Sequence, residues 1–365
     1  MQLVLENVSK KFGADDHLYP MSLTLVPGTI NVLLGTTRAG KTSLMRLMAG
    51  LDRPSAGKIL VDGVDKTGVS VSKRNLAMVY QQFINYPAFT VFDNIASPLR
   101  IRKVPEAQIR TRVLELAERL HITPYLQRTP AELSGGQQQR TALARALIKD
   151  ADLLLLDEPL VNLDYKLREE LRRELTELFS EGKTTVVYAT TEPLEALQLG
   201  GHCAVLHEGR LLQQGPTLDV FNAPASIAVA RTFSDPPINL MPARLDADGM
   251  AQVGGMALPL SPAQRQAAAG HGEVVLGLRA HSLHLAPHSP LDFAIEVMID
   301  LAEIGGSETF IHAHNGALAL VAQLNGVHDL ALGANCTMYC KPDALFVFSP
   351  DGTLLFAPAL TSAGE

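Results

Sequence analysis

The apolar and polar positions in the first part of the chain alternate between strand-like and helix-like segments. Apolar residues alternate or run together over 4–8, 23–26 and 30–34, which predicts three strands. The third strand ends in Gly35, and residues 40–50 predict a helix. We therefore expect a strand, a loop and a helix in direct succession.

Helices and buried strands continue to alternate beyond this unit. Pro105 suits the first turn of a helix, and apolar residues follow it at helical spacing, at Ile109, Val113, Leu116 and Leu120. In chain order, the further predicted elements are a helix over 134–149, a buried strand over 153–156, a helix over 167–178 that stops near Gly182, a strand over 184–189, a helix over 194–199 and a hairpin of 203–206 with 210–213. This order indicates an α/β domain.

The pattern changes near residue 235, at an Asp-Pro-Pro sequence. Beyond it, helical periodicity nearly vanishes and short alternating segments are separated by Gly, Pro, Asn and Asp, which predicts a small all-β domain. We place the boundary there, with domains over 1–235 and 236–365. Residues 263–270 are a predicted surface helix or loop, and 361–365 a predicted frayed tail.

Composition narrows the class of protein. The 365 residues suit two domains, and a hydrophobic fraction of 47% with 19% charged residues is typical of a globular chain. The net charge of −7 argues against nucleic acid as a partner. No apolar run reaches the length of about eighteen residues that a membrane span needs, and no signal peptide is apparent, so we expect a cytoplasmic protein.

The cysteine and histidine residues show no pattern typical of a metal site. Cys203, Cys336 and Cys340 are predicted to be free, buried thiols. Pro287 interrupts any helix that would align the nearby histidines, and no acidic or Cys ligand stands at a matching step. We expect solvated surface side chains at His281, His284, His288, His312 and His314.

The loop after the third predicted strand carries the first chemical motif. Residues 35–42 read G-T-T-R-A-G-K-T, which fits the phosphate-binding pattern G-x-x-x-x-G-K-[ST] between a strand and a helix. Backbone N–H groups form a concave anion site, Lys41 reaches the β- and γ-phosphates, and the Thr42 hydroxyl suits Mg²⁺. The predicted nucleotide site comprises Gly35, Thr36, Thr37, Arg38, Ala39, Gly40, Lys41, Thr42 and Ser43.

Two adjacent carboxylates supply the second half of this site. The apolar strand over 153–156 ends in Asp157 and Glu158. At the end of a buried strand, Asp157 suits the surroundings of Mg²⁺, and Glu158 suits the water that attacks the γ-phosphate. We therefore predict Asp157 as a metal-site residue and Glu158 as a catalytic residue.

A second anion site is predicted at the start of the helix over 134–149. Ser134 is a good N-cap, and Gly135 and Gly136 leave backbone N–H groups bare behind it. Because one γ-phosphate does not need two such sites, we infer that two ATPase domains face each other. ATP then lies between the loop at Gly35 of one domain and Ser134 of the other.

The stretch from Leu133 to Arg140, LSGGQQQR, resembles the signature of the ABC transporter ATPases nearly letter for letter, and the resemblance covers the whole chain. It implies ATP and Mg²⁺ as ligands and a helical subdomain over about 86–150. It also implies that the nucleotide of the opposite subunit is contacted by Ser134, Gly135, Gly136 and Gln137.

Three further positions take their predicted roles from this resemblance. Gln81 matches the glutamine that touches Mg²⁺ and senses the membrane partner, and Asp164, in Asn162-Leu163-Asp164, matches the loop between the two ATPases. Phe12 matches the aromatic residue that stacks on adenine. An ordinary core ring is the alternative for Phe12, and Tyr19 is a second candidate.

The sequence is similar to one subgroup of the family, the import ATPases for sugars and polyols. This similarity lies in residues 86–96 and 167–171, and the segments 276–279 and 339–348 look like the paired β-modules, related to oligonucleotide/oligosaccharide-binding barrels, of such importers. The implied partners are a second ATPase subunit, two transmembrane permease subunits and, indirectly, an extracytoplasmic solute-binding protein. The implied place is the cytoplasmic face of the plasma membrane.

Two features depart from the pattern of the family. Arg38 stands where the usual loop has Gly, and Thr36-Thr37 where it has Pro-Ser, but the general motif tolerates both, so we expect ATP to bind. Thr191 stands where relatives have the histidine that contacts the γ-phosphate. Because a hydroxyl cannot carry charge as an imidazole does, we predict slow hydrolysis in the pocket of this chain.

The A-T-T-E-P sequence over 189–193 is similar to one of the two unlike ATPases of bacterial glycerol importers. We therefore expect a heterodimer with one productive site, and glycerol or a related polyol as the solute. A catalytically impaired, nucleotide-gated scaffold subunit is the alternative. A soluble ABC-type ATPase acting on nucleic acid is a third hypothesis, and the acidic charge and the β-modules speak against it.

Overall fold

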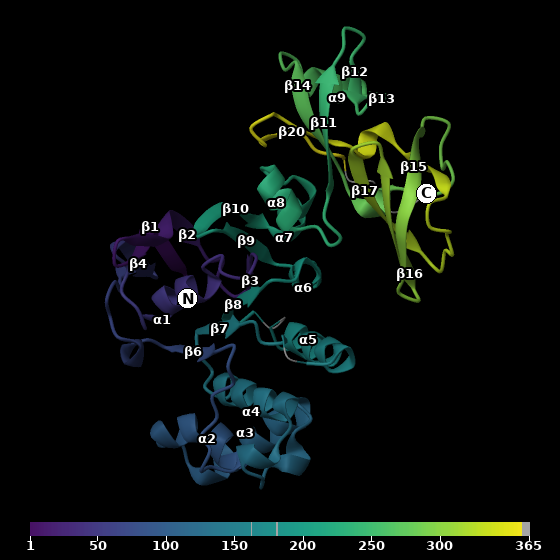
Figure 1. Cartoon of the computed structure of the whole chain (residues 1–365). Coiled ribbons are helices and arrows are strands. Elements are labelled where there is room, and N and C mark those ends of the chain that lie inside the picture. The colour runs from purple at the N-terminus through teal and green to yellow at the C-terminus, as the bar shows by residue number, and fades with distance from the viewer. Residues whose placement is uncertain (162, 180–181, 360–365) are drawn as a thin grey trace. The chain divides into compact units, whose positions relative to one another are not determined.

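The computed structural model describes residues 1–161, 163–179 and 182–359, and it forms two compact units (Figure 1). The N-terminal unit is Met1–Thr217, and the C-terminal unit is Leu218–Glu365. Asn162 and the predicted tail over 361–365 lie outside the described residues. The domain boundary near residue 235 stays a prediction.

The N-terminal unit opens with an antiparallel sheet in the order β2-β1-β4-β5. Its strands are β1 (Leu3–Phe12), β2 (Asp15–Thr24), β4 (Ala56–Val61) and β5 (Val64–Asp65). The predicted strand over 23–26 was misplaced, because β2 pairs along β1 from Val4↔Thr24 to Phe12↔Asp15. The polar residues at the start of β2 conceal this pairing from an apolar pattern.

A largely parallel sheet in the order β10-β9-β3-β8-β7-β6 carries the chemistry. Its strands are β3 (Ile30–Leu34), β6 (Leu76–Val79), β7 (Leu153–Asp157), β8 (Thr185–Thr190), β9 (His202–His207) and β10 (Arg210–Pro216). β8 pairs in parallel with both β3 and β7. The carboxyl ends of these three strands therefore lie at one edge, where ligands bind in sheets of this kind.

Helices of the N-terminal unit cover the sheet and form a separate group at its β6 edge. They are α1 (Lys41–Ala49), α2 (Val91–Ile101), α3 (Glu106–Arg119), α4 (Gly135–Leu147), α5 (Tyr165–Phe179) and α6 (Pro193–Leu199), with short 3₁₀ turns η1 (Val71–Lys73), η2 (Thr123–Tyr125) and η3 (Pro130–Glu132). Figure 1 shows α2, α3 and α4 gathered together. The sequence pattern missed α2, because Pro98 stands inside it.

The C-terminal unit is built mainly from two antiparallel sheets, which agrees with the predicted all-β domain. One has the order β13-β12-β11-β14-β19-β20 and the other β17-β16-β15-β18. The strands of the first are β11 (Asn239–Leu245), β12 (Met250–Val253), β13 (Met256–Pro259), β14 (Glu273–Leu278), β19 (Phe346–Phe348) and β20 (Leu354–Phe356). Those of the second are β15 (Phe293–Ile304), β16 (Glu308–Asn315), β17 (Leu318–Asn325) and β18 (Asn335–Cys340).

Both sheets of the C-terminal unit share one apolar core, which includes Leu276, Ile295 and Ile311. The short helices of this part of the chain are α7 (Thr217–Asn222), α8 (Ile227–Thr232), α9 (Pro262–Ala267), η4 (Ala280–Ser282) and η5 (Pro342–Ala344). Among the described residues of the whole chain, no helix is long and apolar enough to cross a membrane.

Candidate active site

The phosphate-loop motif lies between β3 and α1, where the sequence predicts it. Gly40 caps α1 with a φ of 98°, and a Cβ there would lie 2.5 Å from a methyl group of Leu18. A Cβ at Gly35 would lie 2.3 Å from the carbonyl oxygen of Leu206. Close packing therefore requires glycine at both positions. At Gly40 the left-handed backbone requires it as well. Between them, Thr36, Thr37 and Arg38 are exposed, and Ala39 is buried.

Lys41 is buried beneath this loop and points back along it. Its Nζ donates hydrogen bonds to the carbonyl oxygens of Gly35 at 2.8 Å and Thr36 at 3.1 Å. The same Nζ forms an ion pair with Oε1 of Glu158 at 3.3 Å. Burial lowers the pKa of Lys41, while the carboxylates of Glu158 and Asp157 oppose that shift. The ammonium group is thus held at the loop, where phosphate oxygens could accept hydrogen bonds from it.

Thr42 and Asp157 meet at the edge of the parallel sheet. The Thr42 hydroxyl donates to Oδ2 of Asp157 at 2.8 Å. Asp157 is 2% exposed, and its Oδ1 has no hydrogen-bond partner among the described residues. Burial raises the pKa of Asp157, and the charge of Glu158 adds to that shift. A hydroxyl beside an unsatisfied carboxylate oxygen fits a hydrated Mg²⁺ ion, which prefers oxygen ligands.

Glu158 joins the loop to the segment after β6. It begins the turn after β7 with a φ of +46°. Gln81 Nε2 donates to Glu158 Oε2 at 2.9 Å, while Lys41 holds Oε1. The structure thereby brings Lys41, Gln81 and Glu158 together, and Thr42 and Asp157 lie beside them.

The signature segment forms a well-capped helix start. Ser134 Oγ accepts from the N–H of Gln137 at 3.4 Å, and Gln137 Oε1 accepts from the N–H of Ser134 at 3.0 Å. A Cβ at Gly135 would meet nothing within 4 Å, whereas one at Gly136 would lie 2.9 Å from a methyl group of Leu167. Gly135 therefore leaves open backbone for a ligand, and Gly136 permits the packing of α4 on α5.

The segment after β8 is anchored on both sides of Thr191. Thr190 Oγ1 donates to the buried Glu195 at 2.6 Å. Glu192 accepts two hydrogen bonds from Arg168, at 2.7 and 2.9 Å. The half-buried Thr191 side chain between these anchors adds a hydroxyl and no charge.

The two aromatic residues that could stack on adenine, Phe12 and Tyr19, differ in how far their ring faces are covered by other side chains. Phe12 is 54% exposed, with Lys10 on its face at 5.3 Å and the ring of His17 against it at 5.0 Å. Arg210 covers the ring of Tyr19 at 3.5 Å from its centroid. Phe12 is thus the better placed of the two for stacking, and this role stays a prediction.

Sequence reasoning missed one residue of the site, His17. Its Nε2 lies 2.6 Å from Oγ of Ser43, in the first turn of α1. The turn at Gly13 and Ala14, which folds β2 back on β1 near Phe12, was the signal that would have found it.

Asp164 acts as a cap in the structure. Its Oδ1 accepts from the N–H of Leu167 at 2.9 Å, at the start of α5. Its predicted role between two ATPases stays a prediction, and its neighbour Asn162 lies outside the described residues.

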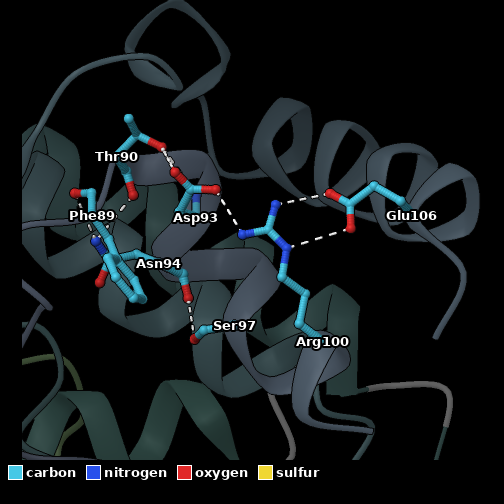
Figure 2. A network of polar contacts seen from close by, with 7 residues as sticks. All are labelled: Phe89, Thr90, Asp93, Asn94, Ser97, Arg100 and Glu106. Atoms are coloured by element: carbon cyan, nitrogen blue, oxygen red, sulfur yellow. Dashed lines mark hydrogen bonds and ion pairs between the residues drawn. The ribbon is translucent and has the colours of Figure 1, made fainter. Parts of the chain in front are cut away.

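A polar network fixes the loop that precedes α2 (Figure 2). Asn94 is fully buried; its amide donates to the carbonyl oxygens of Tyr86 and Phe89 at 3.1 and 3.2 Å, and its Oδ1 accepts from the N–H of Tyr86 at 2.8 Å. Arg100 bonds both Asp93 and Glu106, as Figure 2 shows. The Asn94 side chain thus joins the loop over 86–90 to α2, and the side chains of Tyr86 and Phe89 are exposed.

The three cysteines are free, with Cys203 and Cys340 buried and Cys336 partly buried. Within the described ranges, no group of three or more His, Cys, Asp and Glu side chains has a metal-binding arrangement.

Comparison with known proteins gives two family matches. The model of the family described as ABC transporter matches residues 18–161, and that of the MalK OB fold domain matches residues 235–282. The trehalose/maltose import ATP-binding protein MalK of Thermococcus litoralis is 38% identical, over 94% of this chain and 96% of its own length. The sn-glycerol-3-phosphate import ATP-binding protein UgpC of Bordetella avium is 35% identical, over 96% of this chain and 97% of its own length.

A solved structure is similar to part of the chain. It is the dimeric post-hydrolysis state of the ATP-binding cassette MJ0796 bound to ADP and Pi. It matches with a TM-score of 0.55 and 28% identity, covering 59% of this chain and 98% of that one.

Proposed function

Because the chain belongs to the ATP-binding subunits of ABC importers, we propose that it powers the uptake of a small polyol, with glycerol as the favoured solute. The predicted fold class is confirmed, as are an ABC transport ATPase, ATP and Mg²⁺ as ligands, and a peripheral place on the cytoplasmic side of the membrane. The names of the relatives specify trehalose, maltose and sn-glycerol-3-phosphate. Glycerol is supported by the A-T-T-E-P sequence over 189–193.

The observation that carries the ATPase chemistry is the meeting of five side chains at one sheet edge: Lys41, Thr42, Gln81, Asp157 and Glu158. Mg²⁺ supplies charge neutralisation at the transferring phosphoryl group when it is bound. Lys41 would hold the phosphate oxygens, and Thr42 with Asp157 would hold the metal. Glu158 accepts a proton or hydrogen bond from the attacking water.

Glu158 is occupied in the structure, because Lys41 holds one of its oxygens and Gln81 the other. We infer that nucleotide binding frees it. Phosphate oxygens would compete with Glu158 for the Lys41 ammonium. Because this ammonium is buried, a nearby anion stabilises its charged form. Breaking these two contacts readies Glu158 for water and lets Gln81 respond to the nucleotide.

Our proposal for the identity of the partner ATPase subunit rests on Thr191. The pocket of this chain has a threonine, anchored between Thr190 and Glu192, at the position of the γ-phosphate histidine. Its helix start at Ser134 keeps the arrangement needed to contact a nucleotide held by another subunit. A different ATPase subunit with its own histidine would complete one efficient site, so we propose a heterodimer.

The surface proposed for the permease lies beside the network of Figure 2. A groove of about 660 Å³ is lined by Tyr80, Tyr86, Ile101 and Arg145, among others, and Ile101 is 80% exposed. Tyr80 precedes Gln81, so this groove adjoins the nucleotide site along the chain. An amphipathic helix of a membrane subunit suits such a groove, because its apolar face would cover the exposed rings.

Two measurements test this function. Native mass spectrometry of the membrane complex, purified through a tag on this chain, should find one copy beside a different ATPase subunit, and two copies would refute the heterodimer. Uptake of labelled glycerol into vesicles with the complex should exceed that of sn-glycerol-3-phosphate; the reverse order would refute the glycerol assignment.

The alternative is a scaffold subunit that binds ATP without hydrolysing it, which the missing histidine favours. In the complex, Glu158→Gln and Ser134→Ala separate the two hypotheses. If this chain takes part only through its signature, Ser134→Ala abolishes turnover and Glu158→Gln leaves it unchanged. A working pocket in this chain requires that Glu158→Gln lowers turnover as well.

A further inference from the structure

The C-terminal unit contains a cavity of about 720 Å³ that has no part in the ATPase site. Its lining comes from α7, α9, the loop after β14, the segment between β18 and β19, and β19 and β20 with the residues that follow. The rings of Phe221, Phe346 and Phe356 supply apolar lining. Arg279 and Lys341 supply two positively charged side chains. A largely apolar cavity with a few charged groups is typical of small-molecule sites.

Arg279 is a buried cation in the lining of this cavity. It is 7% exposed, and its guanidinium donates to the carbonyl oxygen of Phe221 at 2.6 Å and to Oγ of Ser234 at 3.3 Å. It stacks at 3.7 Å from the ring centroid of Phe221 and at 5.4 Å from that of Phe346. These contacts hold the guanidinium in place, but all of its partners are neutral. Because it makes two hydrogen bonds and has five N–H donors, some of these donors remain free to bind a ligand.

The charge of Arg279 is not neutralised by the part of the chain that the structure describes. No described carboxylate forms an ion pair with it, and burial alone lowers its pKa to about 10. Burying a cation without a counter-ion raises the free energy of the fold. Binding of an anion beside Arg279 would lower that free energy, so the cavity favours an anionic ligand. The planar guanidinium suits a phosphate or carboxylate group, which it binds through two parallel hydrogen bonds.

Three histidines lie in the lining of the same cavity. The rings of His284 and His288 lie 4.1 Å apart, centroid to centroid, and tilt by 32°. Burial and the charge of Arg279 lower the pKa of His281. Burial, His288 and Lys341 lower the pKa of His284, although Asp292 opposes that shift. The only carboxylate in the described lining is that of Asp343, which is exposed.

We propose that this cavity binds a small organic anion, whose phosphate or carboxylate group pairs with Arg279 and Lys341 and whose carbon part packs on the phenylalanine rings. The proposal concerns only the C-terminal unit and does not depend on the solute proposed above. The charged and titratable groups of the described lining are His281, His284, His288, Arg279, Lys341 and Asp343, and Asp292 lies near His284 outside it.

The test is titration calorimetry of the full chain with glycerol 3-phosphate, in the presence of saturating MgATP so that the phosphate loop is occupied. Arg279→Gln should weaken binding at least about tenfold, since it removes a charge-assisted pair. Because Arg279 is buried and its loss can disturb the fold, Lys341→Gln is a second variant; its side chain is exposed, and it should weaken binding about threefold or more.

Matched controls locate the site. Arg244→Gln removes the same charge from the same unit, at an exposed ion pair with Glu273 outside the cavity, and should leave affinity unchanged. Absence of binding, or binding unaffected by both Arg279→Gln and Lys341→Gln, would overturn the proposal. Equal affinity for inorganic phosphate would overturn the role of the phenylalanine rings.

Discussion

Replacement of Asp157 by asparagine should act in opposite directions on the free chain and on the nucleotide complex. In the free chain the Asp157 carboxylate is 2% exposed, one oxygen is bonded by Thr42, and the other is unpaired. Burial and the neighbouring Glu158 raise its pKa, so its ionised form destabilises the fold. Asp157→Asn keeps the shape and the acceptor for Thr42 while removing the charge.

The size of the effect follows from the unpaired oxygen. A buried polar atom without a partner costs about 1–3 kcal/mol, and more when it is charged. The asparagine amide also lacks a partner, so only the charge-dependent part is recovered, and we expect the free energy of unfolding to rise by about 1–2 kcal/mol near pH 7.

The pH dependence has a definite sign. The pKa of Asp157 is higher in the fold than in the unfolded chain, so the folded carboxyl binds its proton more tightly. The destabilisation is complete above the folded pKa and absent below the unfolded value of about 3.9. The advantage of Asp157→Asn should therefore shrink as the pH falls through this window.

The assay is urea denaturation of the free chain, repeated with MgATP. MgATP at about one hundred times its Kd should raise the free energy of unfolding by about 2.7 kcal/mol. The Asp157→Asn variant should lose most of this stabilisation, because its metal site lacks a charge. Asp152→Asn, an exposed residue just before the same strand, is the control and should change neither quantity. A free chain that becomes less stable on Asp157→Asn would refute the reasoning.

Three further outcomes can be checked directly. Gly35→Ala places a Cβ 2.3 Å from the Leu206 carbonyl oxygen and should weaken ATP binding at least about tenfold by fluorescent-nucleotide titration; retained affinity would contradict the packing argument. Leu276→Ala empties part of the core of the C-terminal unit and should lower its free energy of unfolding by about 2–5 kcal/mol in calorimetry, with ATP binding retained. Arg100→Gln breaks an exposed network (Figure 2) and should shift the melting temperature by less than about 2 °C; a larger shift would show that the network stabilises α2 strongly.

Local patterns in the sequence predicted many of the elements. The loop at Gly35, the apolar β7 run and the cap at Ser134 are each coded within a few residues, because a phosphate loop, a buried strand and a helix start depend on neighbours along the chain. α2 escaped notice because Pro98 lies within it. β2 was misplaced because its pairing with β1, and not its apolar alternation, sets its position.

The sequence by itself determined which residues bear the chemistry, and the tertiary structure decided which of them meet. Thr42 and Asp157 lie 115 residues apart, and Gln81 and Glu158 lie 77 apart, yet each pair is joined by a hydrogen bond. These meetings follow from the strand order β3-β8-β7-β6, which no local pattern encodes. The contact of His17 with Ser43 and the cavity around Arg279 likewise appear only when distant segments pack, because side-chain distances depend on the folding of the whole unit.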